Sequence, residues 1–365
     1  MSIETRYRLR PSVSLVPTKH PFVWEFFQSN TRRIRHIKVI DNNLIEIVKN
    51  LNGESIQSIF EKYNSDKSNI QNFIYYLYDQ CYIEDLELAQ KINSDPFNRV
   101  INFIADYYPT HEAINAFNKL QNSKVLIVGL GAVGSWVAHL LTQNGVTNFV
   151  LCDPDIINTG NLNRSLFYYD DVGKFKTTCV KEHIRHINPF TYITCFNSLI
   201  EKSEDIINII DNSYTSLDLV INCADFPNVD TTSEYIAKAC MKKNIPHIIS
   251  GGYNLHLSLI GPSIIPYSTP CYFCIKKGLE QANPPEFKNI KKLSRKRRNL
   301  GNISPITGIS SAFTTFEAFR VLIASDRIWP LMAGRRGEFN FLTSELNYSE
   351  YPKLEYCDWC GCVYS

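Results

Sequence analysis

The chain has 365 residues, with 38 Lys and Arg against 36 Asp and Glu, so its formal net charge is only +2. So small a net charge argues against broad electrostatic binding to nucleic acid or to a membrane surface. The sequence has no apolar run of the ~18–20 residues that a membrane span needs, and its first residues lack the apolar core of a secretion signal. We therefore expect a cytoplasmic protein whose 11 cysteines stay reduced.

Residues 1–90 are expected to form a small separate domain with strands and helices. Strands are indicated by alternating and β-branched residues, and helices by apolar residues at helical spacing. The two strand segments and then the three helical segments are 6–17, 32–41, 42–53, 54–63 and 67–83. Asn42 or Asn43 is expected to cap the first helix. This order suggests a winged-helix-like module, and a generic α+β packing domain is the alternative.

Residues 91–122 are expected to form a polar helical linker, and the pattern changes at residue 123. In 123–365, short β-rich runs alternate with helical stretches, which predicts an α/β fold with a Rossmann-like, doubly wound, mostly parallel sheet. The expected strands are 124–130, 148–155, 192–200, 217–225 and 245–253.

A basic segment at 288–298 has seven Lys and Arg among its 11 residues. It follows Pro284 and Pro285, which favours an exposed loop. The alternatives are a solvated loop, a loop that closes over a phosphate-bearing substrate, and a nucleic-acid patch. No aromatic residues interleave these charges, which argues against nucleic acid.

A glycine-rich turn follows the strand at 124–130. Gly129, Gly131 and Gly134 form G-x-G-x-x-G, which is typical of a phosphate-binding turn before a helix. Asp153 ends the next strand, 19 residues after Gly134, where a carboxylate can accept hydrogen bonds from ribose hydroxyls. These features alone fit a dehydrogenase that uses NAD and an enzyme that uses ATP equally well.

Three charged residues further along the chain favour ATP. Arg164 and Lys176 follow Asp153, and each can neutralise phosphate oxygens. Asp225 ends another apolar strand, where a carboxylate close to phosphates is a natural Mg²⁺ ligand. Hydride transfer has no evident use for this set, so the sequence predicts a site for ATP and Mg²⁺.

Four cysteines form two C-x-x-C pairs, Cys271 with Cys274 and Cys357 with Cys360. Four thiolates are typical of tetrahedral structural Zn²⁺, because they leave no open position for water. The sequence therefore predicts a zinc site that ties the C-terminal end of the chain back onto its domain.

Together these motifs resemble the ThiF/MoeB/ubiquitin-activating (HesA/MoeB/ThiF) superfamily over about residues 123–361. The resemblance rests on G-x-G-x-x-G, D-x-D at 153–155, N-L-N-R at 161–164, V-G-x-x-K at 172–176 and the strand-end Asp225. It implies an enzyme that adenylates a C-terminal carboxylate with ATP and Mg²⁺. It also implies a homodimer and a zinc site of the same kind.

The resemblance extends the nucleotide site to further positions. Asp155, Asn161 and Asn163 fall within its motifs, and Arg99 is the expected counterpart of an arginine that often comes from the partner subunit. The family usually has Gln after the N-L-N-R arginine, whereas this chain has Ser165, so that position receives no role.

Within the superfamily, the chain is most similar to the MccB-like enzymes of microcin C maturation. It shares their length, an N-terminal peptide-clamp domain and the lack of an acyl-accepting cysteine, since residues 275–356 contain none. This implies activation of the C-terminal carboxylate or carboxamide of a short ribosomal precursor peptide, giving a peptide–nucleotide conjugate. The alternatives are activation of a Gly-Gly sulfur-carrier protein and a non-catalytic scaffold that presents a peptide. CTP is an alternative to ATP.

Overall fold

A computed structural model describes residues 3–63, 66–213, 216–250, 253–254, 256–282 and 301–361. The chain divides into two compact units, residues 1–119 and 120–365. The boundaries that we predicted at residues 90 and 122 remain predictions. The basic segment 288–298 lies outside the described residues.

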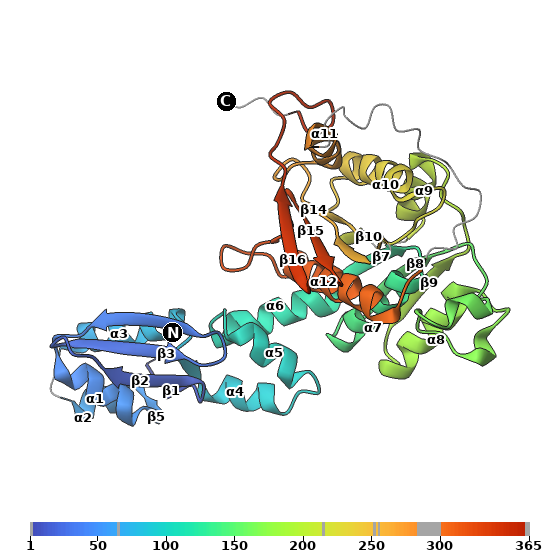
Figure 1. Ribbon diagram of the computed structural model, residues 1–365. Coiled ribbons are helices and arrows are strands. Elements are labelled where there is room, and N and C mark those ends of the chain that lie inside the picture. Colours follow the sequence, from blue (N-terminus) through green and yellow to red (C-terminus); the bar gives the residue numbers. More distant parts are fainter. Residues whose placement is uncertain are drawn as a thin grey trace. The chain divides into compact units, whose positions relative to one another are not determined.

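The N-terminal unit combines two antiparallel sheets with a series of short helices (Figure 1). In one sheet β1 lies between β5 and β6, and in the other β3 lies between β2 and β4. The elements are β1 (Arg6–Leu9), β2 (Val13–Pro17), β3 (Val23–Gln28), β4 (Arg33–Lys38), α1 (Asn42–Asn50), β5 (Asn52–Ser55), α2 (Ile56–Lys62), α3 (Lys67–Asp79), β6 (Ile83–Asp85), α4 (Leu86–Asn93), α5 (Asn98–Ala105) and α6 (Thr110–Asn122).

The core of this unit contains apolar side chains that recur at helical spacing. Ile70, Ile74 and Leu77 lie on one face of α3 and are fully buried. They belong to the same apolar cluster as Ile56 and Ile59 of α2. Residues three and four positions apart share one face of a helix, so this burial is what the sequence pattern predicts.

The C-terminal unit is built on a six-stranded sheet in the order β14-β11-β10-β7-β8-β9. All neighbouring pairs are parallel except β11 with β14, which confirms the predicted doubly wound, mostly parallel fold. A smaller antiparallel sheet has the order β12-β13-β15-β16. The strands are β7 (Lys124–Val128), β8 (Asn148–Cys152), β9 (Tyr192–Phe196), β10 (Leu219–Asn222), β11 (His247–Ile249), β12 (Tyr253–Asn254), β13 (Leu257–Ile260), β14 (Ser263–Ile264), β15 (Arg335–Asn340) and β16 (Glu345–Glu350).

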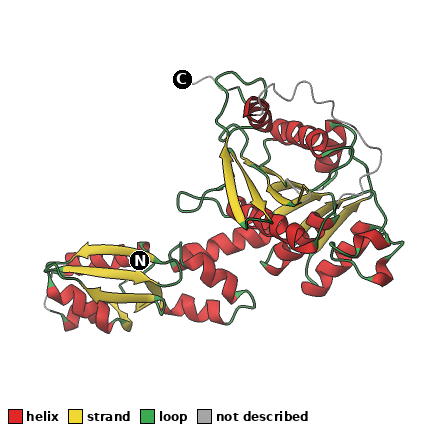
Figure 2. Ribbon diagram, in the orientation of Figure 1, coloured by secondary structure: helices red, strands yellow, loops and turns green. Residues whose placement is uncertain are grey.

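Helices cover both faces of the central sheet, as Figure 2 shows by colour. α9 and α10 pack on one face, and α7, α8 and α12 lie on the other. The helices are α7 (Ala132–Gln143), α8 (Lys176–Ile187), α9 (Ser203–Asp211), α10 (Val229–Lys243), α11 (Tyr272–Ala282) and α12 (Ser304–Leu322); two short 3₁₀ turns span Thr159–Asn161 and Tyr169–Asp171. Strands buried on both faces need continuous apolar runs, which explains the sequence of β7.

The connectivity of the sheet fixes where a ligand can bind. From β7 the chain adds β8 and β9 on one side, and then returns to place β10 on the other side of β7. Ligands of open α/β sheets bind beyond the carboxyl ends of the strands at such a switch point. The glycine turn that follows β7 lies at this point.

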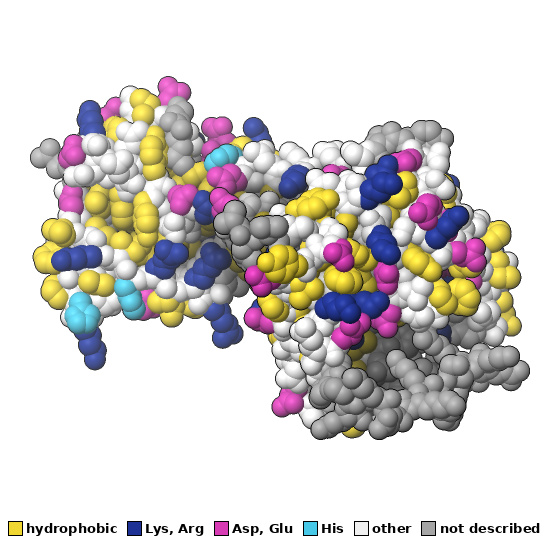
Figure 3. Space-filling view, turned by 90° about the horizontal axis from the view of Figure 1, so that it is seen from above, with side chains coloured by type: hydrophobic (Ala, Val, Ile, Leu, Met, Phe, Trp, Pro, Cys, Tyr) yellow, Lys and Arg dark blue, Asp and Glu magenta, His cyan; other side chains and the backbone are white. Residues whose placement is uncertain are grey.

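Two observations bear on membrane insertion and on the charge of the face shown in Figure 3. Among the described residues, no helix is both long and apolar enough to cross a membrane. Positive and negative side chains are interspersed on the face shown in Figure 3. This distribution agrees with the formal net charge of +2.

Candidate nucleotide site and metal centre

The glycine turn between β7 and α7 is shaped by three glycines with different functions. Gly129 has φ +85°, and a Cβ there would lie 2.5 Å from the backbone nitrogen of Ala224. A Cβ on Gly134 would lie 1.9 Å from the carbonyl oxygen of Gly129. A Cβ on Gly131 would meet no described atom within 4 Å. The fold therefore requires glycine at the first and third positions, whereas at the second it leaves open space.

This difference gives a testable prediction. Gly134→Ala is expected to lower the free energy of unfolding by at least ~2 kcal/mol, because backbone must move to admit the methyl group. Gly131→Ala is expected to keep wild-type stability but to weaken nucleotide binding about tenfold, or ~1.4 kcal/mol, because its methyl group enters the open space. Chemical denaturation and calorimetry measure the two effects. Unchanged nucleotide affinity in folded Gly131→Ala would contradict the assignment of that space to a ligand.

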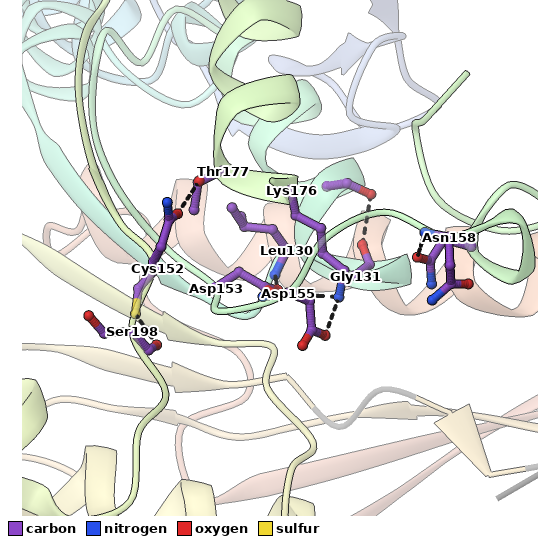
Figure 4. A network of polar contacts seen from close by, with 12 residues as sticks. Leu130, Gly131, Cys152, Asp153, Asp155, Asn158, Lys176, Thr177 and Ser198 are labelled. Atoms are coloured by element: carbon purple, nitrogen blue, oxygen red, sulfur yellow. Dashed lines mark hydrogen bonds and ion pairs between the residues drawn. The ribbon is translucent and has the colours of Figure 1, made fainter. Parts of the chain in front are cut away.

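Asp153 follows β8 and is tied to the glycine turn (Figure 4). Its Oδ2 accepts a hydrogen bond from the backbone N–H of Leu130 at 2.6 Å, and its Oδ1 accepts one from the N–H of Asp155 at 2.9 Å. Burial raises the pKa of Asp153, and the Lys176 ammonium and these two N–H groups oppose that rise. The carboxylate is thus held rigidly at the carboxyl end of the sheet.

Lys176 is the first residue of α8 and joins two carboxylates. Its Nζ lies 2.7 Å from Oδ2 of Asp155 and 3.6 Å from Oδ1 of Asp153. Lys176 is 7% exposed, whereas the side chain of Asp155 is 63% exposed. One buried cation is therefore placed beside a buried carboxylate and a solvated carboxylate, next to the glycine turn.

Arg164 is positioned by the loop that contains the first 3₁₀ turn. Its Nη1 donates to the carbonyl oxygen of Gly160 at 2.6 Å and to Oδ1 of Asn163 at 2.9 Å. The indole N–H of Trp136 in α7 donates to the Arg164 carbonyl oxygen at 3.2 Å, which joins this loop to the helix after the glycine turn. Asn161 closes the turn, since its Oδ1 accepts from the N–H of Asn158 at 3.0 Å.

Two buried polar atoms of this loop lack partners among the described residues. They are Nε of Arg164 and Oγ of Ser165. Buried polar groups are normally hydrogen-bonded. An anion bound beside the loop would satisfy such groups, so these atoms fit a site that is completed by its ligand.

The remaining predicted site residues differ in their placement. Asp225 is exposed and follows the carboxyl end of β10, the strand next to β7. It therefore lies at the same edge of the sheet as the glycine turn. Arg99 is exposed on α5 and belongs to the N-terminal unit.

The two C-x-x-C pairs come together as one cluster. Cys271 and Cys274 lie at the start of α11, and the ligand atoms of all four cysteines lie within 4.8 Å of one another. The Sγ–Sγ distances are 3.4 Å for Cys271–Cys357 and 3.7 Å for Cys274–Cys360. Ligands at ~2.3 Å around a tetrahedral ion lie about 3.8 Å apart, so these buried thiols could hold a metal ion.

Two contacts at the carboxyl end of the sheet were not predicted from the sequence. The N–H of Leu130 anchors Asp153, and the hydroxyl of Thr177 in α8 donates to Oδ1 of Asn197 at 2.5 Å. Thr177 directly follows Lys176, and Asn197 directly follows β9. A polar residue just beyond the carboxyl end of a parallel strand was the available signal.

Comparisons with known proteins show which family the chain is similar to. The ThiF family matches residues 110–357. The chain is 28% identical over 252 residues to the sulfur carrier protein ThiS adenylyltransferase of Escherichia coli K12, covering 68% of this chain and 90% of that enzyme. It is 25% identical over 291 residues, or 76% of this chain, to the adenylyltransferase and sulfurtransferase UBA4 of Candida albicans, and spans only 60% of that protein.

The fold is also similar to a solved structure along nearly the whole chain. Escherichia coli MccB, solved with ATP, superimposes with a TM-score of 0.74 and 21% identity, covering 97% of this chain and 99% of that one. MccB solved with AMPCPP and MccA gives the same TM-score. The family match and the relatives identify this chain as a member of the ThiF family and as an adenylyltransferase.

Proposed function

We propose that this enzyme transfers AMP from ATP to the C-terminal carboxylate or carboxamide of a short ribosomally made peptide, giving a peptide–nucleotide conjugate as in microcin C-like bacteriocin biosynthesis. The observation that carries the proposal is the cluster of Lys176, Asp153 and Asp155 beside the glycine turn at the switch point of the sheet. A dehydrogenase would need the turn and one ribose-binding acid, but not the buried cation.

The described residues fit ATP. The open space at Gly131 would admit phosphates, whose charge the N-terminus of α7 favours. Asp153 would accept ribose hydroxyls, and Lys176 and Arg164 would face phosphate oxygens. Asp225 would hold Mg²⁺. Asp155, Asn161 and Asn163 would support the cation and the loop, as their contacts already do.

The chemistry needs positioning and charge neutralisation. A carboxylate oxygen of the peptide attacks the α-phosphorus, a C–O–P linkage forms, and the bond to the β-phosphate oxygen breaks to release pyrophosphate. Lys176 and Arg164 would offset the negative charge that develops on the phosphoryl oxygens. Mg²⁺ supplies further neutralisation of the phosphates when bound.

For the metal centre we propose structural Zn²⁺, because four thiolates suit Zn²⁺ and leave no open position. Leu354 supports this role, since its backbone N–H donates to Sγ of Cys274 at 3.5 Å. The metal would hold the chain around Cys357 and Cys360 against the start of α11.

For the N-terminal unit we propose peptide binding. β4 pairs with β3 on one side, and its residues are almost all exposed. Arg33, Arg35 and Lys38 make this strand basic, so an acidic extended segment would suit it as an added strand. The likeness to MccB, solved with MccA, includes this unit, because it covers 97% of the chain.

A polar hollow of about 450 Å³ in the same unit supports this role. Arg10 lines it and is 4% exposed, and its Nε has no partner among the described residues. Its Nη2 donates to Oγ1 of Thr110 at the long distance of 3.5 Å. A buried guanidinium with so few partners would suit a peptide carbonyl or carboxylate.

A second candidate function is activation of a Gly-Gly sulfur-carrier protein. The 28% identity to the ThiS adenylyltransferase over 90% of that enzyme favours it. A non-catalytic scaffold would not need the intact set of nucleotide-binding residues, which weighs against that alternative. We further propose a cytoplasmic homodimer in which Arg99 serves the partner subunit's site.

Release of pyrophosphate tests the proposal and separates the candidates. The purified protein with ATP and Mg²⁺ is offered either a short peptide encoded beside its gene or a Gly-Gly sulfur carrier. We expect pyrophosphate with the peptide and none with the carrier. Release with the carrier alone would replace the proposal by the second candidate. ATP binding without release with either substrate would favour the scaffold.

A further inference from the structure

The order of strands in the central sheet predicts where each part of a nucleotide lies. β7 ends in the glycine turn, β8 ends in Asp153, and β9 ends beside Asn197. Neighbouring strands are ~4.8 Å apart. Phosphates at the end of β7 and ribose at the end of β8 therefore leave the end of β9 for the base. The backbone N–H of Asp153 donates to the carbonyl oxygen of Phe196 at 3.1 Å, so the ends of β8 and β9 are joined directly.

The side chain of Asn197 is held in one orientation at this position. The hydroxyl of Thr177, which is fully buried, donates to its Oδ1 at 2.5 Å. The amide oxygen of Asn197 thus faces Thr177, and the amide nitrogen points the other way. Among the described residues, Nδ2 of Asn197 has no hydrogen-bond partner, and Asn197 is exposed. The site thus presents a fixed N–H donor beyond the position of the ribose.

We propose that Asn197, oriented by Thr177, determines base specificity by donating a hydrogen bond from Nδ2 to an unprotonated ring nitrogen on the Watson–Crick edge of the base. This inference rests on the proposed function, because it assumes that a nucleoside triphosphate binds between the glycine turn and Asp153. Adenine N1 and cytosine N3 are acceptors, whereas guanine N1 and uracil N3 carry hydrogen. The site should therefore accept ATP or CTP and reject GTP and UTP.

The test compares ATP with inosine triphosphate, whose N1 carries a hydrogen, by calorimetry on the full-length protein with Mg²⁺. We expect the wild type to bind ATP at least about tenfold more tightly, as one unmatched hydrogen bond implies. Asn197→Ala should bring the ratio of the two affinities, ATP to inosine triphosphate, close to one. Asn197→Asp should shift it towards inosine triphosphate, because an oxygen acceptor then replaces the N–H donor. Thr177→Val should reduce the ratio by freeing the amide, and Thr177→Ser should preserve it.

Ser198→Ala is the matched control, since Ser198 is the exposed neighbour of Asn197 and contacts Cys152 through its backbone oxygen. It should keep the wild-type ratio. The measured quantity is the ratio of the dissociation constants for inosine triphosphate and ATP. If this ratio is the same for wild type and Asn197→Ala within about twofold, the inference is wrong while the proposed function stands. If the wild type binds no nucleoside triphosphate, the proposed function and this inference both fail. Thermal unfolding of each variant checks that it is folded.

Discussion

Replacing Lys176 by alanine should lower the rate of AMP transfer by about 10²–10³, the usual effect of removing one preorganised charge from a transition state. Nζ of Lys176 lies within 3.6 Å of two carboxylate groups at the end of the sheet, and its side chain is almost fully buried. The variant should remain folded, because Asp153 keeps its two backbone N–H donors. Steady-state pyrophosphate release and circular dichroism measure the two properties.

Lys174→Ala is the matched control for this experiment. Lys174 lies two residues earlier and pairs with Asp171 at 3.3 Å on the surface, with its side chain 49% exposed. Surface ion pairs contribute little, so its rate and stability should stay close to wild type. A folded Lys176→Ala variant whose rate of AMP transfer is within tenfold of the wild-type rate would refute the role of this lysine.

Loss of one cysteine of the proposed zinc site should cause the largest change in stability. Cys274→Ser is expected to lower the zinc content from one ion per chain to well below one and to cost at least ~4 kcal/mol of unfolding free energy, because structural zinc binding contributes ~10–16 kcal/mol in small domains. The melting temperature should fall by ~10 °C or more. Elemental analysis and calorimetry measure these quantities.

Cys195→Ser serves as the control, because Cys195 is a free thiol on β9 outside the cluster. It should retain its zinc and lose little stability. A Cys274→Ser protein with wild-type melting temperature would show that the cluster is not a structural metal site. The conclusion would be the same if the wild-type protein contained no zinc and a chelator left its melting temperature unchanged.

The fold could be predicted from the sequence wherever one interaction dominates. The buried runs of β7, β8 and β10 identify a parallel sheet, and α3 follows its apolar spacing. β3 was missed because its sequence, VWEFFQ, lacks simple alternation; only pairing with β2 and β4 makes it a strand. The predicted cap of α1 was wrong by one or two residues, since Asp41 caps it by accepting from the N–H of Asn43.

The residues of the candidate site, too, could be predicted only where a local sequence pattern marks them. Spacing alone pointed to the glycines, and the four cysteines were predicted as a set that the fold does bring together. The contact of Lys176 with Asp155 depends on how α8 begins beside the end of β8, which no local pattern encodes. Nor did a local pattern predict the bond between Thr177 and Asn197, because the residues lie 20 positions apart on different elements.

The most direct test of the account is the intact mass of a short peptide encoded beside the gene, after incubation with the enzyme, ATP and Mg²⁺. Peptide adenylation predicts a gain of one nucleoside monophosphate on the peptide. Loss of water with ATP consumed would instead indicate cyclisation of an activated side chain or terminal amide. An unchanged peptide, in the presence of an enzyme that activates a Gly-Gly carrier, would contradict peptide adenylation.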